Sequence, residues 1–190
     1  MLETVHDEII ITSLVKYGDN DAIARVFTQE HGRLSLFCRS AFKPSKRRGS
    51  TVQTMARGRA GFKLKEHKLS TLTELDIGAY THALASSLRG FSLAAYACEI
   101  VEVFVAEHDP APKVFDLLDN FLRLASSKPI STLAIRTFES KLLQACGLLS
   151  IEESKEQDLK KMADLFTWHL RQHKQTPLKS LAFFKQVMPS

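Results

Sequence analysis

The stretch Ala24–Cys38, "ARVFTQEHGRLSLFC", consists of two short β-prone runs separated by a turn. The runs are Ala24–Thr28 and Arg33–Cys38, and both are rich in residues that favour strands. Gly32 stands between them, where a hairpin requires a residue that tolerates positive φ. The stretch therefore predicts a β-hairpin.

Similar runs lie on both sides of this hairpin, at Glu8–Val15, Phe62–Lys65 and Leu69–Ile77. Gly18, followed by Asp19 and Asn20, marks a further turn before the hairpin. Five short strands in fewer than 80 residues predict a small closed or partly closed barrel.

The pattern becomes helical after Gly78, where apolar residues recur every three or four positions. One long helix is expected from about Leu84 to a point before Pro110, and a second from Pro112. The other expected helices lie at about 130–147, at about 152–173 and after residue 177. The chain is thus predicted to be α+β, with a barrel domain at 1–78 and an all-helical domain at 79–190.

Export and membrane insertion are not predicted. The N-terminus, "MLETVHDEII", has acids where an export signal needs a basic flank, and the most apolar later run, Phe91–Ala106, is interrupted by Glu99 and Glu102. We therefore expect a cytoplasmic protein. The cysteines are odd in number and widely spaced, which indicates buried or incidental thiols without disulfides: Cys38, Cys98 and Cys146.

Positive charge is concentrated between Arg33 and Lys68. This window contains eleven Lys or Arg and one acid, so it carries +10, whereas the whole chain carries +5 and the other 154 residues sum to −5. Such a window is either a solvated face or a surface that binds nucleic-acid phosphates, and we favour the second. The candidate contacts are Arg33, Arg39, Lys43, Lys46, Arg47, Arg48, Arg57, Arg59, Lys63, Lys65 and Lys68.

Three parts of the window support this interpretation. Lys46, Arg47 and Arg48 must lie in an exposed loop, because burying three adjacent cations would be too costly. Arginines on both sides of Gly58 adjoin a backbone that can approach a polyanion closely. In the run Phe62–Lys65 the two lysines alternate with apolar residues, so both lie on one face of a strand.

The window has few aromatic residues that could stack on bases. These are Phe37, Phe42 and Phe62, and the last is expected to point into the core. Binding is therefore expected to favour phosphates over bases. A protein that leaves the base edges free allows two strands to test pairing, which makes strand annealing physically plausible.

Catalytic patterns are weak. Asp19 and Asp21 could bind a hard cation, but acids in a turn are usually turn and cap residues. His169 and His173 are spaced i, i+4 without the glutamate of a metalloprotease motif, and we interpret them as surface residues. We expect a binding protein with no catalytic residues and no metal. Two alternatives stay open: a generic nucleic-acid-binding protein, and a metal-dependent phosphodiesterase that uses these two aspartates with Glu30.

The segment Tyr17–Arg48, "YGDNDAIARVFTQEHGRLSLFCRSAFKPSKRR", resembles the opening of the RecO family of recombination mediators. The segments "FESKLLQACG", at 138–147, and "PLKSLAFFKQV", at 177–187, are similar to later helices of that family. The residues that carry the resemblance are Tyr17, Gly18, Asp21, Phe27, Thr28, Glu30, His31, Gly32, Leu34 and Ser35, then Tyr96, Glu99, Phe115, Leu117, Leu118, Phe138, Glu139, Lys141, Leu142, Leu143 and Gly147.

The resemblance implies an OB-type barrel, a helical body and a role in DNA repair and homologous recombination. It implies binding to single- and double-stranded DNA, strand annealing, and loading of the recombinase RecA onto DNA coated by single-stranded-DNA-binding protein. It also implies two direct partners in the bacterial cytoplasm, RecR and the acidic C-terminal tail of single-stranded-DNA-binding protein. We expect this tail to dock near Arg171, Lys174 and Lys179.

The sequence departs from the family pattern in two places. Many members carry a four-cysteine zinc module after the glycine-ended helix, whereas no cysteine follows Gly147 here, so neither this module nor any cofactor is expected. The family's proline after the basic loop is also missing, because "TVQTMARGRAG" stands at 51–61.

Overall fold

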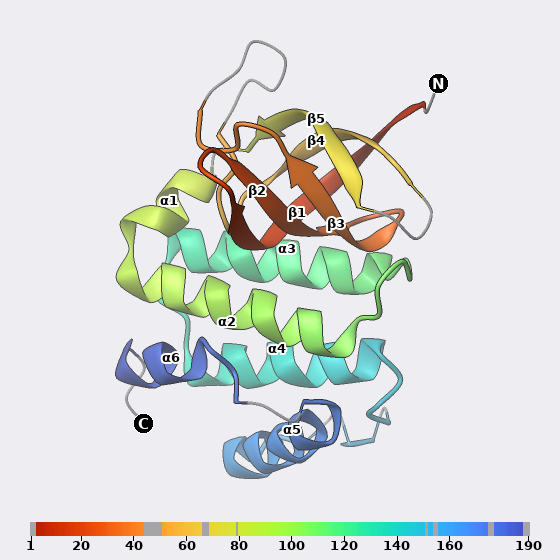
Figure 1. The fold of residues 1–190 in the computed structure, drawn as a ribbon. Coiled ribbons are helices and arrows are strands. Elements are labelled where there is room, and N and C mark those ends of the chain that lie inside the picture. Colours follow the sequence, from red (N-terminus) through yellow and green to blue (C-terminus); the bar gives the residue numbers. More distant parts are fainter. Residues whose placement is uncertain are drawn as a thin grey trace. The chain divides into compact units, whose positions relative to one another are not determined.

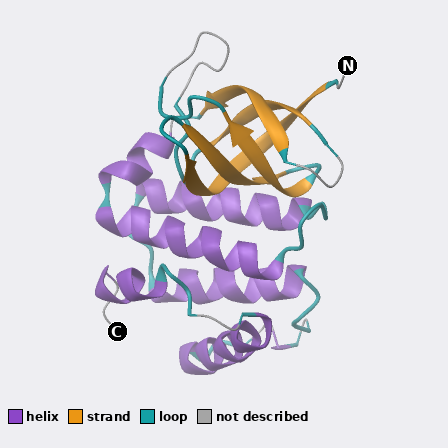
Figure 2. Cartoon of the chain, in the orientation of Figure 1, coloured by secondary structure: helices purple, strands orange, loops and turns teal. Residues whose placement is uncertain are grey.

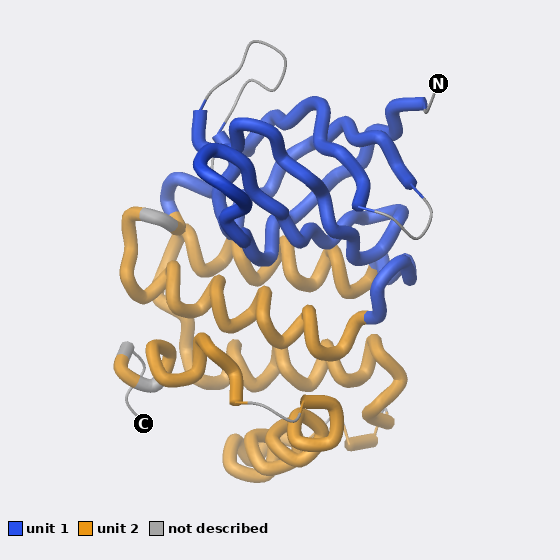
Figure 3. Tube along the Cα trace, in the orientation of Figure 1, with its two compact units in different colours: residues 1–83, 106–112 blue, residues 84–105, 113–190 orange. Residues whose placement is uncertain are grey.

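The structure is a computed structural model that describes residues 3–43, 51–65, 69–78, 80–150, 152–153, 156–174 and 177–187. Within these residues, strands occupy the N-terminal part and helices follow (Figures 1 and 2). The chain divides into two compact units, which we call the barrel unit and the helical unit (Figure 3). The barrel unit comprises residues 1–83 and 106–112, and the helical unit comprises residues 84–105 and 113–190.

Five strands close into a barrel in the order β1-β2-β3-β5-β4. All neighbouring pairs are antiparallel except β3 and β5, which are parallel. A five-stranded barrel followed by helices confirms the predicted fold class, and each predicted strand is present. The strands are β1 (Thr4–Tyr17), β2 (Asp21–Thr28), β3 (Gly32–Cys38), β4 (Arg57–Lys63) and β5 (Ser70–Ile77).

The barrel interior is filled by alternate residues of every strand, as the period of a strand requires. Phe62 is fully buried in this core, so its predicted inward orientation is confirmed. The register shifts at two places, between Ile11 and Ser13 on β1 and between Gly61 and Phe62 on β4. The inward side chains include Ile9, Ile11, Ala24, Val26, Leu34, Leu36, Phe62, Leu72 and Leu75.

The hairpin between β2 and β3 is held by a buried carboxylate from β1. Asp7 Oδ2 accepts a hydrogen bond from the Glu30 backbone N–H, at 3.0 Å. The same oxygen pairs with His31 Nδ1, at 2.8 Å. Thr28 Oγ1 accepts from the His31 N–H at 2.9 Å and donates to the Gly32 carbonyl at 3.0 Å. These bonds satisfy polar groups of the turn, so the Thr-x-Glu-His-Gly sequence has a structural role here.

Gly32 is required for two reasons. Its φ is +70°, and the predicted hairpin required a positive φ at this position. A Cβ here would also lie 2.4 Å from the carbonyl oxygen of Asp109. Asp109 belongs to the segment 106–112, which contacts the hairpin within the barrel unit through a hydrogen bond from the His108 N–H to the Arg33 carbonyl, 3.0 Å long. The hairpin and this segment therefore fit together only if residue 32 has no side chain.

The helices are α1 (Tyr80–Ser86), α2 (Leu88–Phe104), α3 (Pro112–Ser127), α4 (Thr132–Ala145), α5 (Leu159–His173) and α6 (Leu181–Val187). Two boundaries differ from the prediction. The first long helix begins at Leu88 because the Ser87 side chain caps it, and the fourth begins at Leu159 because Asp158 caps it. Gly147, with φ of +72°, follows the end of α4 as expected.

A single carboxylate fixes the C-terminal segment of the helical unit onto α2. Glu99 Oε1 accepts hydrogen bonds from Lys174 Nζ, at 2.6 Å, and from the Lys179 N–H, at 2.9 Å. Glu99 Oε2 accepts from the N–H and the hydroxyl of Ser180, at 2.8 and 2.7 Å. Partial burial opposes ionisation, but these hydrogen bonds prevail and lower the pKa of Glu99 to about 2.

A second, buried network joins α2 to α4. The Tyr96 hydroxyl donates to Glu139 Oε1, and Arg136 Nη1 binds Glu139 Oε2, each at 2.5 Å. Burial raises the pKa of Glu139 despite these partners. The Tyr96 ring also stacks on Phe184 of α6, with 4.5 Å between the ring centroids. Residues that carried the family resemblance in the helical half therefore hold α2, α4 and α6 together.

Within the described residues, the helices fall short of the length and apolar character that a membrane span requires.

Replacing Gly32 with alanine should destabilise the barrel unit strongly. The substitution places a Cβ against the Asp109 backbone in addition to straining a positive φ. Gly18→Ala is the matched control, because φ is +64° there but nothing lies within 4 Å of the added Cβ. We expect a loss of about 1–2 kcal/mol for Gly18→Ala and at least ~2 kcal/mol more for Gly32→Ala, measured by urea unfolding. Equal losses would contradict the role given to Asp109.

Replacing Glu99 with glutamine should remove a pH-dependent part of the stability. Because the folded pKa of Glu99 is lowered to about 2, the stabilisation is complete above its ordinary pKa, near 4.5, and is lost as the pH falls towards 2. Glu99→Gln should therefore lower the free energy of unfolding at pH 7, by roughly 1–3 kcal/mol, and the deficit should shrink between pH 4.5 and 2. Asp164→Asn, which removes a carboxylate from the exposed side of α5, is the control at pH 7 and should leave the free energy of unfolding nearly unchanged.

Candidate nucleic-acid interface

The outer surface of β1, β2 and β3 combines aromatic, apolar and basic side chains. The register places Val15 opposite Ile23, and Ile23 opposite Phe37, so these three form one row across the strands. Tyr17 and Arg25 lie on the same outer surface, because they share the strand alternation of this row. We call this set the aromatic face: Val15, Tyr17, Ile23, Arg25 and Phe37.

Two of these side chains are unusually exposed for their type. Tyr17 is 59% exposed and Val15 is 52% exposed. The Tyr17 ring meets the Phe37 ring edge to face, with 5.9 Å between the centroids. Because β1 and β3 flank β2, the two rings meet over β2 and form a platform. Exposed rings with neighbouring cations are what single-stranded nucleic acid requires, and the outer face of strands 2 and 3 is the usual ligand site of OB folds.

Further cations lie at the end of the barrel where the β1–β2 turn is found. The Ser40 N–H donates to Asp21 Oδ1, at 2.8 Å, and the Ala41 N–H donates to the Asn20 carbonyl, also at 2.8 Å. The residues that follow β3 are thereby fixed beside this turn, and Arg39 and Lys43 are exposed there. The predicted contacts Lys46, Arg47, Arg48 and Lys68 lie outside the described residues.

The cations of β4 lie among acids and do not form a purely basic strip. Arg57 forms an ion pair with Glu8 of β1, at 2.5 Å, and Arg59 lies in register between Glu8 and Asp76 of β5. On the same surface His6 contacts Glu74 at 3.1 Å. The window from Arg33 to Lys68 excluded these acids because Glu8 precedes it and Glu74 and Asp76 follow it.

The strand expected at Phe62–Lys65 in fact runs from Arg57 to Lys63, so Lys65 lies beyond it and its N–H donates to the Ser70 hydroxyl, at 3.1 Å. Gly58 lies inside β4, where a Cβ would come within 1.9 Å of the Asp76 carbonyl oxygen. The glycine is thus explained by the close approach of β4 and β5 rather than by the approach of a polyanion.

The Arg33 side chain is also largely buried and pairs with an acid of the same unit. It is only 16% exposed and lies 3.7 Å from Glu107. The structure therefore brings Arg39 and Lys43 together at the rim of the aromatic face, but it places Arg33 and the β4 cations elsewhere. Sequence reasoning missed Tyr17 and Arg25 because both precede the basic window. The alternation of Ile23 and Arg25 with buried alanines on β2 was the signal that could have identified them.

The acids proposed for a phosphodiesterase are not assembled. The Asp21 carboxylate binds the Ser40 N–H, as a turn residue does. Glu30 lies in the hairpin beyond the opposite end of β2, and an eight-residue strand spans about 23 Å between its first and last residues. Across the described ranges, no group of three or more His, Cys, Asp or Glu side chains is placed to share a metal ion.

The histidine pair on α5 differs from the expected surface pair. His169 is buried, and this burial lowers its pKa. His173 Nδ1 lies 2.9 Å from the His169 carbonyl oxygen, and its ring packs against Phe104. The prediction of two surface residues is therefore wrong for His169, which belongs to the core of the helical unit.

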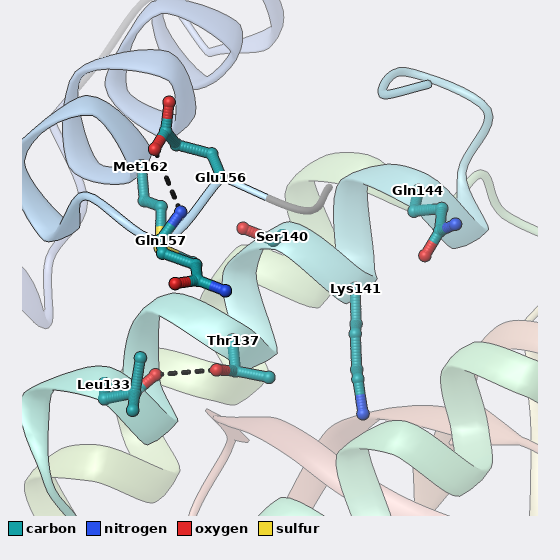
Figure 4. Close-up of a pocket in the computed structure, with 8 residues that line it drawn as sticks. All are labelled: Leu133, Thr137, Ser140, Lys141, Gln144, Glu156, Gln157 and Met162. Carbon is teal, nitrogen blue, oxygen red and sulfur yellow. Dashed lines mark hydrogen bonds between the residues drawn. The ribbon is translucent and has the colours of Figure 1, made fainter. Parts of the chain in front are cut away.

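Two hollows adjoin α4 in the helical unit. One, of about 550 Å³, lies between α4 and the start of α5, with Gln157 and Met162 opposite Thr137 and Ser140 (Figure 4). The other, of about 380 Å³, lies between α3 and α4 and is more apolar, with Phe121 and Leu124 in its lining. Leu133, Thr137 and Lys141 line both hollows.

The cations expected to bind a partner do not line either hollow. Arg171 is exposed on the last turn of α5. Lys174 is mostly buried in its ion pair with Glu99, and the Lys179 N–H binds the same carboxylate. Among the described residues that line these two hollows, Lys141 is instead the cation, and it borders both of them.

Comparisons with known proteins agree with this architecture. The family model "Recombination protein O N terminal" matches residues 1–80, and "Recombination protein O C terminal" matches residues 85–149. The DNA repair protein RecO of Pelobacter propionicus is 34% identical over 137 residues, which cover 72% of this chain and 56% of that protein. The one of Myxococcus xanthus is 28% identical over 148 residues, which cover 78% and 61%.

A third relative, the DNA repair protein RecO of Anaeromyxobacter dehalogenans, is 30% identical over 143 residues, which cover 74% of this chain and 56% of that protein. The chain thus spans less than two thirds of the length of these curated relatives. The two family models together extend over the barrel, α2, α3 and α4. The chain belongs to the Recombination protein O family, the RecO family.

Proposed function

We propose that this chain is a DNA-binding mediator of DNA repair and homologous recombination. It anneals complementary strands and helps to load the recombinase onto DNA coated by single-stranded-DNA-binding protein. The observation that carries this proposal is the aromatic face with cations at its rim, on an OB-type barrel. The family assignment supports it, because the relatives are named DNA repair proteins.

Binding through this surface is mainly electrostatic. Arg25, Arg39 and Lys43 are exposed on or beside the aromatic face, and the basic loop with Lys46, Arg47 and Arg48 follows directly in the sequence. Cations that hold phosphates release counterions from DNA, so affinity depends steeply on salt. Contacts to phosphates leave the hydrogen-bonding edges of the bases available, and a second strand can then pair with the bound one.

The proposed protein partners are RecR, the acidic and apolar tail of single-stranded-DNA-binding protein and, indirectly, RecA. For the tail, the α3–α4 hollow fits better than the region of Arg171, Lys174 and Lys179. It combines apolar walls with Lys141, whereas Lys174 is already paired with Glu99. Apolar residues of the tail would enter the hollow and its carboxylates would lie near Lys141.

Replacing Lys46, Arg47 and Arg48 together with alanine should weaken DNA binding and annealing while leaving the melting temperature nearly unchanged. The sequence predicts an exposed loop for these three residues, and charges in such a loop contribute little to stability. The slope of log affinity against log salt should become shallower by up to about three units, close to one for each phosphate that the variant no longer neutralises. Fluorescence anisotropy with labelled oligonucleotides at several salt concentrations measures both quantities.

The matched control removes the same charge from the helical unit, at Lys113, Lys128 and Lys160, which are all exposed. This control should retain DNA affinity and the salt slope. Equal losses in both variants would show that only net charge matters. Normal DNA binding and annealing in the loop variant would exclude the loop from the DNA path.

Reversing the charge at Lys141 should weaken binding of a peptide with the acidic, apolar character of the tail. We expect Lys141→Glu to lower the affinity by about tenfold or more, because it places a like charge beside the peptide carboxylates. Arg171→Glu is the control and tests the placement expected from the sequence. Isothermal titration calorimetry with a synthetic peptide distinguishes the two sites, and a loss confined to Arg171→Glu would reject the α3–α4 hollow.

A further inference from the structure

We propose that Tyr17, supported by Phe37, is the residue that makes the aromatic face prefer single-stranded over double-stranded DNA, by stacking on an unpaired base. This inference rests on the proposed function, because it assumes that the barrel binds DNA. It assigns a specificity-determining role to a residue outside the basic window.

The position of Tyr17 suits a stacking residue. It is the last residue of β1, and most of its side chain is exposed although the Phe37 ring contacts it. This contact limits the orientations that the ring can adopt, so less conformational entropy is lost when a base binds. The next residue, Gly18, has open space around it, because a Cβ there would meet no atom within 4 Å. The ring itself is accessible to a base because Tyr17 is 59% exposed.

The charges around Tyr17 indicate an anionic ligand. Arg25 is exposed on the same face, and Arg39 and Lys43 are exposed beside the β1–β2 turn. Two acids lie close by: Asp19 is in this turn, and Asp21 begins β2 opposite Tyr17, where its carboxylate accepts a hydrogen bond from the backbone N–H of Ser40. An exposed ring bordered by arginine and lysine matches the alternation of bases and phosphates in a single strand.

Only a single strand can use this platform. In a duplex each base is stacked between its neighbours, so its face is not available to a side chain unless the base is unstacked, which is costly. A base stacked on an aromatic ring contributes on the order of 10- to 100-fold in affinity, with little dependence on its identity. Tyr17 should therefore add affinity for single strands and none for duplexes.

This preference is compatible with annealing. Stacking uses the face of a base and leaves its pairing edge accessible to a second strand. Once the base has paired, it gains its stacking partners within the duplex and leaves Tyr17. The aromatic face then holds the product only through phosphate contacts, so the duplex dissociates more easily than the single strand did.

The test compares three DNA probes of equal length: oligo(dT), an abasic strand with the same phosphates, and a duplex. The wild-type protein should bind oligo(dT) about tenfold or more tightly than the abasic strand. Tyr17→Ala should bind the two equally, with unchanged affinity for the duplex and an unchanged salt slope, because no charge is removed. Tyr17→Phe should retain the preference. Trp168→Ala, which removes a 57% exposed ring from α5 in the helical unit, is the matched control.

The outcomes separate this inference from the proposed function. If Tyr17→Ala keeps the preference for oligo(dT), or loses affinity equally for all three probes with a normal thermal melt, the stacking role is overturned while DNA binding stands. If the wild type binds none of the probes, both proposals fail. Loss of the preference in Tyr17→Ala, together with its retention in Tyr17→Phe and Trp168→Ala, supports the assignment.

Discussion

The bulge at Thr12 determines what the barrel presents to solvent. β1 pairs with β4 through its first half and with β2 through its second half, and the register shifts between Ile11 and Ser13. Without this extra residue, the strict alternation that points Ile9 and Ile11 inward would also point Val15 and Tyr17 into the core. The Thr12 hydroxyl donates to the Arg25 carbonyl, at 3.2 Å, and so stabilises the shift. The contribution of β1 to the aromatic face, Val15 and Tyr17, therefore depends on one inserted residue.

Strand positions were predictable because turns and alternating apolar residues are local signals. All five strands and the main helices were located this way. The true start of β4 at Arg57 was not, because glycines there suggested a loop. Their reason is the approach of β5, a contact between residues distant in sequence. The starts of α2 and α5 were misplaced because the capping residues Ser87 and Asp158 were not recognised.

The candidate site was less predictable for the same reason. A charge count along the sequence cannot include Glu8, Glu74 and Asp76, which lie among the β4 cations only after the barrel closes. It also cannot show that Tyr17 and Phe37 meet across β2. Of the three aromatic residues in the window, only Phe62 is buried, whereas Phe42 is 46% exposed and Phe37 meets Tyr17 on the outer surface. On the folded barrel, the proposed DNA site combines residues that precede the basic window, such as Tyr17 and Arg25, with residues inside it, such as Phe37 and Arg39.

The contact between Gly32 and Asp109 has a consequence for biosynthesis. The hairpin leaves the ribosome early, but the segment that covers it is translated only after the whole of α2. During synthesis, one end of the hairpin therefore stays uncovered until residues 106–112 have been translated. The barrel unit can be completed only after α2 has been made. For the same reason, a fragment cut between the barrel strands and α2 would lack the 106–112 segment, and a stable version of the barrel would need that segment restored by a linker.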